Sequence, residues 1–409
     1  MNILISPGSY VFSDYFPGGE FQISYAIASR LAQRGNNIYV FAPLKKLKRE
    51  IPNLTVLEVG EFDFVNPKDY FHYFWDWWKF SIRTYLKAKR LLLEGVPIDV
   101  IHHLRPAYPY KFNLCWRLNK PFIYGPISLT WQGYNNEEEE MKWRKGGVLG
   151  FFRNKLIDRL NMTFGKYLWT VMLKKADCLM VSVKDAINVI PTEHHSKVLT
   201  LPLGVDTNVF KPKLTTVAES FKILFVGNLI CQKGLHYLFE AIAQVKRLFP
   251  AITLTLLGSG KDERYFRKLC EDLQIVENVI FKGFVPFNEI VSFYQNCNIF
   301  CLPSLHEPFG ISTLQAMSCG KPVITTNVGG PPHFVENGKS GYLVPPANSD
   351  LLATALIDLL SDKDKRGEMG EYNRKLCIEK YDWDKIVDEI EQIYQELLSK
   401  QPRSNVVRH

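Results

Sequence analysis

Residues 304–326 read "SLHEPFGISTLQAMSCGKPVITT", and this stretch decides how the whole chain is interpreted. The apolar run just before it, "NIFCLP", and the run "KPVITT" at its end both predict buried β-strands. Between them Gly310 permits a tight turn, and residues 311–319 predict a short helix that ends at Gly320. A helix N-terminus attracts anions because its N–H groups are free and its dipole is positive there. We therefore expect a strand–loop–helix–strand unit whose polar residues, Glu307 among them, lie at an anion-binding helix start.

The composition is that of a globular, cytoplasmic protein. The chain has 409 residues, 46% hydrophobic and 22% charged, which is typical of two domains. A formal charge of +8 favours an anionic partner, but no basic tract or nucleic-acid motif accompanies it. No stretch approaches the roughly 20 apolar residues of a membrane span, and the start "MNILISPGSY" does not resemble a signal peptide. Eight scattered cysteines without metal-like spacing predict reduced thiols.

Short apolar strands alternate with amphipathic helices along the chain. The expected strands are "NILIS", "NIYVFAP", "IDVIHH", "PFIYG", "DCLMVS" and "KVLTLP", then "FKILFVG", "ITLTLLG", "NVIFKG", "NIFCLP", "KPVITT" and "GYLVP". This pattern predicts an α/β protein of two doubly wound, Rossmann-like domains, 1–205 and 206–382, with a linker around Val205–Ser220. Ligands of such sheets bind beyond the carboxyl ends of the strands, so we expect the site in the cleft between the domains.

Polar and glycine-rich loops follow several of these strands. In "VGNLICQKGLHYLFEAI", Lys233 enters a helix and could reach a phosphate, although it could also be an ordinary surface lysine. In "LLGSGKDERYF", Gly258 could let the backbone approach a ligand, but the third glycine of a dinucleotide fingerprint is absent. In the first half, "FPGGEF" brings Gly18 and Gly19 to the start of the first helix. A glutamate such as Glu307 beside a glycine turn is by itself usually a loop residue, but these loops converge at one sheet edge.

Taken together, these segments resemble the retaining glycosyltransferases of family 4, which have the GT-B fold. The matching segments are "VGNLICQKG", "LLGSG", "VIFKGFVP", "LPSLHEPFGISTLQAMSCGKPVITTNVGG" and "NGKSGYLVPP", and more loosely "PGGEFQISYAIASRLAQRGNNIYVFAP", "DVIHH" and "LPLGVDTNVFKP". The resemblance implies that Glu307 contacts the donor sugar and that Lys233 neutralises a diphosphate leaving group. With His103, these are the implied catalytic residues. The implied donor-binding residues are Gly18, Gly19, Asn228, Lys233, Gly258, Val285, Glu307, Phe309, Gly310, Ile311, Ser312 and Gln315.

Two positions depart from the family pattern. Gln315 replaces the glutamate that holds the ribose, which removes a charge-assisted hydrogen bond of ~1 kcal/mol. Asn228 replaces an arginine that pairs with phosphate, a loss of ~1–3 kcal/mol. These departures leave open a non-catalytic, nucleotide-sugar-binding partner subunit. A nicotinamide dehydrogenase is disfavoured by the missing G-x-G-x-x-G.

His102 and His103 end the strand "IDVIHH". Because strand residues alternate, one of them should face the ligand site and the other the interior. By resemblance His103 lies near the donor sugar, and for each the alternative is a satisfied core histidine.

Two segments of the first half suit an anionic membrane surface, although they could equally be packed helices with core aromatics. One is "DYFHYFWDWWKFSIRTYLKAKRLLL" and the other, basic and apolar together, is "MKWRKGGVLGFFRNKLIDRLNMTFGKYLWTVMLKKAD".

By resemblance, a terminal helix over 383–400 packs back on the first domain. The resemblance implies a metal-independent transfer of a hexose, with UDP-glucose favoured as donor, to a polysaccharide or lipid-linked glycan. The expected enzyme needs no cofactor and is cytoplasmic or peripheral on the membrane.

Overall fold

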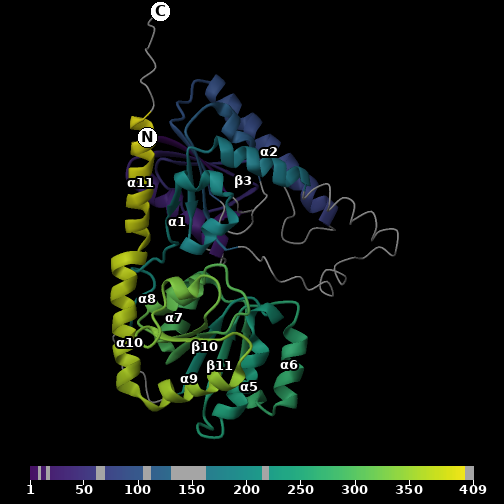
Figure 1. Ribbon diagram of the computed structural model, residues 1–409, viewed down its shortest axis with the longest axis vertical. Coiled ribbons are helices and arrows are strands. Elements are labelled where there is room, and N and C mark those ends of the chain that lie inside the picture. The colour runs from purple at the N-terminus through teal and green to yellow at the C-terminus, as the bar shows by residue number, and fades with distance from the viewer. Residues whose placement is uncertain are drawn as a thin grey trace, which may run out of the picture. The chain divides into compact units, whose positions relative to one another are not determined.

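The computed structural model describes residues 1–7, 11–14, 19–60, 70–104, 112–129, 163–213 and 221–400, without the side chains of 7, 19–21 and 70–74. The chain divides into two compact units (Figure 1). Unit 1 comprises Met1–Pro202 with Val387–His409, and unit 2 comprises Leu203–Ile386. The sequence analysis had set the division at 205/206 and at 382/383.

Unit 1 is built on a seven-stranded sheet in the order β5-β3-β1-β6-β7-β8-β9, with all of its pairs parallel. Its strands are β1 (Asn2–Pro7), β3 (Asn37–Ala42), β5 (Leu54–Glu58), β6 (Val100–Leu104), β7 (Phe122–Ile127), β8 (Cys178–Val181) and β9 (Val198–Thr200). A separate pair joins β2 (Val11–Ser13) to β4 (Leu44–Lys46). The helices are α1 (Gly19–Gln33), α2 (Tyr70–Leu93), residues 163–175, and the short η1 (Leu114–Leu118), η2 (Lys184–Val189) and η3 (Thr192–Lys197). The central strands β1, β6 and β7 are buried along most of their length, as expected for a parallel sheet covered on both faces.

Unit 2 is a six-stranded parallel sheet in the order β12-β11-β10-β13-β14-β15. The strands are β10 (Lys222–Val226), β11 (Thr253–Leu257), β12 (Val279–Gly283), β13 (Ile299–Leu302), β14 (Val323–Thr326) and β15 (Gly341–Val344). The helices are α5 (Leu235–Val245), α6 (Glu263–Asp272), α7 (Phe287–Asn296), α8 (Ile311–Ser318), α9 (Ser349–Ser361) and α10 (Lys363–Leu376). Short turns are η4 (Cys231–Lys233), η5 (Val276–Asn278), η6 (Pro331–His333) and the π-helical η7 (Cys377–Tyr381). The predicted fold class is confirmed, and every predicted strand is present.

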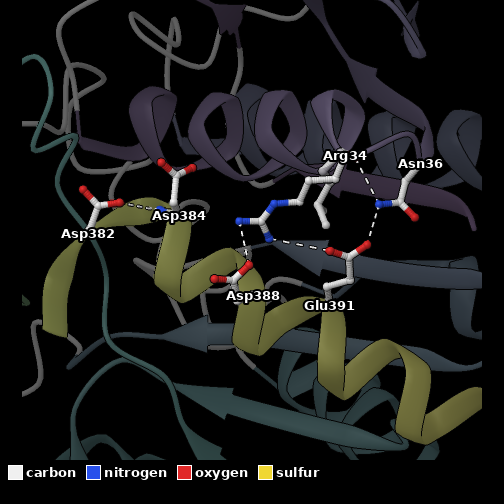
Figure 2. A network of polar contacts seen from close by, with 7 residues as sticks. Arg34, Asn36, Asp382, Asp384, Asp388 and Glu391 are labelled. Atoms are coloured by element: carbon white, nitrogen blue, oxygen red, sulfur yellow. Dashed lines mark hydrogen bonds and ion pairs between the residues drawn. The ribbon is translucent and has the colours of Figure 1, made fainter. Parts of the chain in front are cut away.

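The terminal helix α11 (Trp383–Ser399) joins unit 1 from Val387 onward. Figure 2 shows the polar contacts on this helix: Arg34 pairs with Asp388 at 2.8 Å, and the Asn36 side chain donates to Glu391 at 2.7 Å. Farther along, the Tyr394 hydroxyl lies 2.6 Å from His102 Nδ1 in the core of unit 1. These contacts attach the helix to the turn that follows α1 and to the central sheet.

The predicted linker at Val205–Ser220 is wrong for its described part, residues 205–213. Val205 is buried, and it forms an isolated β-bridge with Asp382. Phe210 is buried as well, and its carbonyl accepts a hydrogen bond from Arg374 at 3.0 Å. Contacts with residues far along the chain therefore hold this segment, despite its turn-forming sequence, as part of unit 2. Residues 214–220 lie outside the described chain.

Candidate active site

The strand order of unit 2 reverses between β10 and β13. β11 and β12 follow on one side of β10, while β14 and β15 follow on the other side of β13. In doubly wound sheets the connections diverge at such a switch point and leave a crevice beyond the carboxyl ends of the strands. The loop after β10 carries Lys233 and the loop after β13 carries Glu307. The topology therefore brings the two predicted catalytic residues to the same crevice.

The loops after β10 and β13 are in direct backbone contact. The Leu305 N–H donates to the Gln232 carbonyl at 2.9 Å. Gly234, at φ +68°, ends η4 and begins α5, and a Cβ there would overlap the Pro303 carbonyl oxygen. Only glycine fits both the left-handed backbone and this close approach.

Lys233 and Glu307 form an ion pair in this crevice. Nζ of Lys233 lies 2.7 Å from Oε2 of Glu307, and their side chains are 14% and 9% exposed. The hydroxyl of buried Ser304 donates to the same oxygen at 3.0 Å. In the part of the chain that the structure describes, no hydrogen bond is made to Oε1 of Glu307. The carboxylate is thus held through one oxygen, and the other oxygen can accept a ligand hydroxyl.

A third loop, after β14, supports the Glu307 backbone. The Gly330 N–H donates to the Glu307 carbonyl at 2.9 Å. Gly329 has φ +67°, and a Cβ at this position would overlap the same carbonyl oxygen. Sequence reasoning assigned no role to these glycines, although "NVGG" lay among the matched segments.

Helix α8 starts directly beside Glu307. Its N-cap is Gly310 at φ +95°, as the sequence predicted for a tight turn. Ile311 and Ser312 follow half-exposed, so the first helical N–H groups lie at the crevice. Phe309 instead turns its ring inward, where it is buried 5.4 Å from the ring of Phe334. Phe309 can offer a ligand only its backbone.

Gln315 is less available to a ligand than the sequence suggested. It is buried on α8, and its Oε1 accepts a hydrogen bond from the Tyr294 hydroxyl at 2.9 Å. Tyr294 is fully buried, and burial raises its pKa well above the usual value, so it stays a neutral donor. The carbonyl oxygen expected to bind a ribose hydroxyl is therefore already engaged, by a tyrosine that the sequence analysis missed.

The loops after β10, β11 and β12 also lie side by side in close backbone contact. The Gly258 N–H donates to the Gly283 carbonyl at 2.8 Å, and a Cβ on Gly258 would overlap the Gly227 carbonyl. Asn228 is exposed next to Gly227, and Val285 is half-exposed beyond Gly283. These residues border the same edge of the sheet as Lys233.

In unit 1, His102 and His103 end β6, beside the switch point between β1 and β6. Both are fully buried, and their rings have different neighbours, so the expectation that one of them faces the ligand site stays a prediction. His103 Nδ1 lies 2.9 Å from the Ser6 carbonyl, which can only accept, so this nitrogen carries the proton. Its ring stacks 5.3 Å from that of Tyr124. Its role toward a donor sugar remains a prediction.

His102 is a core residue. Its Nε2–H donates to the Gly125 carbonyl at 2.9 Å, and its Nδ1 accepts from Tyr394. Burial lowers its pKa to about 4, so it is neutral near pH 7. Gly19 begins α1, and Gly18 lies outside the described residues.

Comparison with known proteins identifies the family. The sequence profile "Glycosyl transferases group 1" matches residues 206–376, which contain the crevice. D-inositol 3-phosphate glycosyltransferase of Corynebacterium urealyticum is 30% identical over 77% of this chain and 76% of its own. The chain belongs to the glycosyl transferases group 1 family. An uncharacterized glycosyltransferase of Methanocaldococcus jannaschii, MJ1607, is 36% identical over 45% of this chain, and the match spans about half of that relative's length (47%).

Solved structures show that this family member has the GT-B fold. Sucrose-phosphate synthase of Thermosynechococcus elongatus superposes with a TM-score of 0.73 at 20% identity, over 98% of this chain and 100% of that one. Anabaena Alr3699/HepE, solved in complex with UDP, gives 0.67 at 18% identity over 97% and 100%. At these identities the likeness concerns the fold alone.

Proposed function

We propose that this protein is a retaining, metal-independent glycosyltransferase that moves a hexose from a nucleotide-diphosphate sugar to a glycan. The ion pair between Lys233 and Glu307 at the unit 2 switch point carries the proposal. A nucleotide-diphosphate sugar needs a cation to neutralise its pyrophosphate and a hydrogen-bond acceptor for its hexose hydroxyls. A lysine beside a carboxylate supplies both.

In the proposed reaction, the acceptor hydroxyl attacks the anomeric carbon on the face from which the diphosphate leaves. The bond between that carbon and the phosphate oxygen breaks, the new glycosidic bond forms, and the acceptor proton passes to the leaving phosphate. Lys233 donates one N–H to Glu307 and has others for the diphosphate. The N–H groups at the start of α8 would stabilise the same developing charge, so no metal ion is needed. Glu307 Oε1 would accept from a sugar hydroxyl.

UDP-glucose is the favoured donor. Anabaena HepE, which shares the fold, was solved with UDP. We propose a polysaccharide or lipid-linked glycan as the acceptor, with the enzyme working in the cytoplasm or at the inner membrane surface. No helix among the described residues is both long and apolar enough to cross a membrane.

A non-catalytic nucleotide-sugar-binding subunit is the second candidate. Asn228 supplies no positive charge where the family pattern has arginine, and the Gln315 oxygen is engaged by Tyr294. Both features would weaken the hold on a donor.

One experiment separates the two candidates. UDP-, GDP- and ADP-sugars are incubated with the protein, with and without glycan acceptors and with and without EDTA, and released nucleotide is measured. The enzyme is expected to release nucleotide with one donor class regardless of EDTA, and the product should keep the donor's anomeric configuration by NMR. Donor binding without transfer or slow hydrolysis would support the binding subunit instead.

A further inference from the structure

Helix α2 of unit 1 exposes a straight apolar stripe. Trp75, Ile82, Leu86 and Leu93 are 47%, 40%, 55% and 79% exposed. They follow one another at about two, one and two helical turns, so they share one face along about 27 Å of helix. The opposite face, with Trp77, Phe80, Thr84 and Ala88, is buried. The stripe is therefore additional to the buried face of α2.

Basic side chains flank the stripe. From Trp75 to Leu93 the exposed charged residues are all cationic: Lys79, Arg83, Lys87, Lys89 and Arg90. The one acid in this range, half-buried Asp76, is 3.4 Å from Lys79. Arg90 also pairs, with Glu94 at 2.7 Å just beyond the helix. The face thus combines an apolar centre with cationic edges.

A neighbouring helix, residues 163–175, extends the apolar surface sideways. Phe164 stacks on Trp78 of α2 with ring centroids 5.4 Å apart, and it is half exposed. One turn farther on, Tyr167 is 62% exposed, and Lys166 beside it is exposed too. Aromatic rings next to lysines are typical of residues that lie at the boundary between lipid and water.

We propose that this face of unit 1 binds the surface of an anionic lipid bilayer, with the stripe inserted between headgroups and the basic residues on lipid phosphates. A straight apolar stripe along one helix can lie flat on a bilayer, and the basic residues beside it match anionic headgroups. Binding by this face does not depend on the reaction performed in unit 2. It would hold the protein beside a lipid-linked acceptor.

Co-sedimentation with vesicles tests the proposal. Full-length protein should sediment with phosphatidylcholine vesicles that contain phosphatidylglycerol, less with phosphatidylcholine alone, and less as salt is raised. Ile82→Ser/Leu86→Ser should lower the partition coefficient at least about tenfold. Arg83→Gln/Lys89→Gln should lower it roughly 25-fold, at about fivefold for each charge.

Matched substitutions on exposed residues of unit 2 serve as controls: Leu248→Ser/Val276→Ser for the apolar pair and Lys268→Gln/Lys363→Gln for the charges. These variants should bind vesicles as the wild type does, and all variants should keep the wild-type Tm. Wild-type protein that stays in the supernatant, or equal losses in the test and control variants, would overturn the proposal. So would a wild-type dimer that the stripe variant converts to monomer, because the face would then join two copies of the chain.

Discussion

Lys233 Nζ lies 2.7 Å from Glu307 Oε2 although the two residues are 74 positions apart in the chain. They follow β10 and β13, the two strands between which the sheet order of unit 2 reverses. The ion pair therefore results from the topology of the sheet. Ser304, which donates to the same carboxylate oxygen, fixes the Glu307 side chain from its own loop.

Lys233→Met should destabilise the protein because it leaves a mostly buried carboxylate without its cation. We expect the free energy of unfolding to fall by about 2–3 kcal/mol. In Lys233→Met/Glu307→Gln the unpaired charge is gone, so much of that loss should be recovered. Urea denaturation of the wild type, both single variants and the double variant measures the coupling. Losses that simply add would show that the pair contributes nothing to stability.

Ser304→Ala should impair function more than stability, because it removes one of the two donors to Glu307 Oε2. We expect kcat/KM for the nucleotide-sugar to fall about tenfold, as for the loss of a hydrogen bond to a charged group. Ser292→Ala, which removes an exposed hydroxyl on α7, is the control. Equal kcat/KM values for the two variants would show that Ser304 has no role in the site.

Gly329→Ala should disrupt the Glu307 loop. Gly329 and Gly338 have similar backbone angles, φ +67° and +81°, but a Cβ overlaps the Glu307 carbonyl only at Gly329 and meets nothing within 4 Å at Gly338. Gly338→Ala should therefore cost only the backbone strain of about 1 kcal/mol. Gly329→Ala should cost more and also weaken donor binding. Thermal unfolding and donor titration compare the two, and indistinguishable variants would argue against a supporting role for this loop.

Much of the fold could be predicted because the long strands are continuous apolar runs, as in β1, β10 and β13. The missed strands β2 and β4 have three residues each, too few for any period, and β5 is a half-exposed edge strand. The linker was mispredicted because the partners of Val205 and Phe210, Asp382 and Arg374, lie about 170 residues away. Local turn propensity carries no information about such distant contacts.

For the site, motif spacing predicted which residues gather but not how they contact each other. The position of Ser304, three residues before Glu307, could have suggested a local hydrogen bond. Nothing in the sequence indicated that Tyr294, on α7, would hold the Gln315 oxygen. Strand alternation predicted different surroundings for His102 and His103, but not that every residue of β6 would be buried.

Acid should destabilise the protein partly through His102. Its pKa is about 4 in the folded state against 6.5 unperturbed, so between these values the unfolded chain binds a proton that the folded chain does not. The free energy of unfolding should therefore fall as pH decreases from 6.5 to about 4, by up to about 3 kcal/mol from this group. His102→Gln should be less stable at pH 7 but show a shallower slope in that window. Parallel pH profiles for the two proteins would exclude His102 as the source.

Calorimetric titration of UDP-glucose and UDP into wild type, Lys233→Met and Lys268→Met tests most directly whether Lys233 and Glu307 hold a nucleotide-diphosphate sugar. Lys268 is an exposed lysine of α6 and controls for the loss of one positive charge. We predict that wild type and Lys268→Met bind both ligands alike, and that Lys233→Met binds each at least about tenfold more weakly. Equal affinity of Lys233→Met and wild type for both ligands would contradict the assignment of this crevice as the donor site.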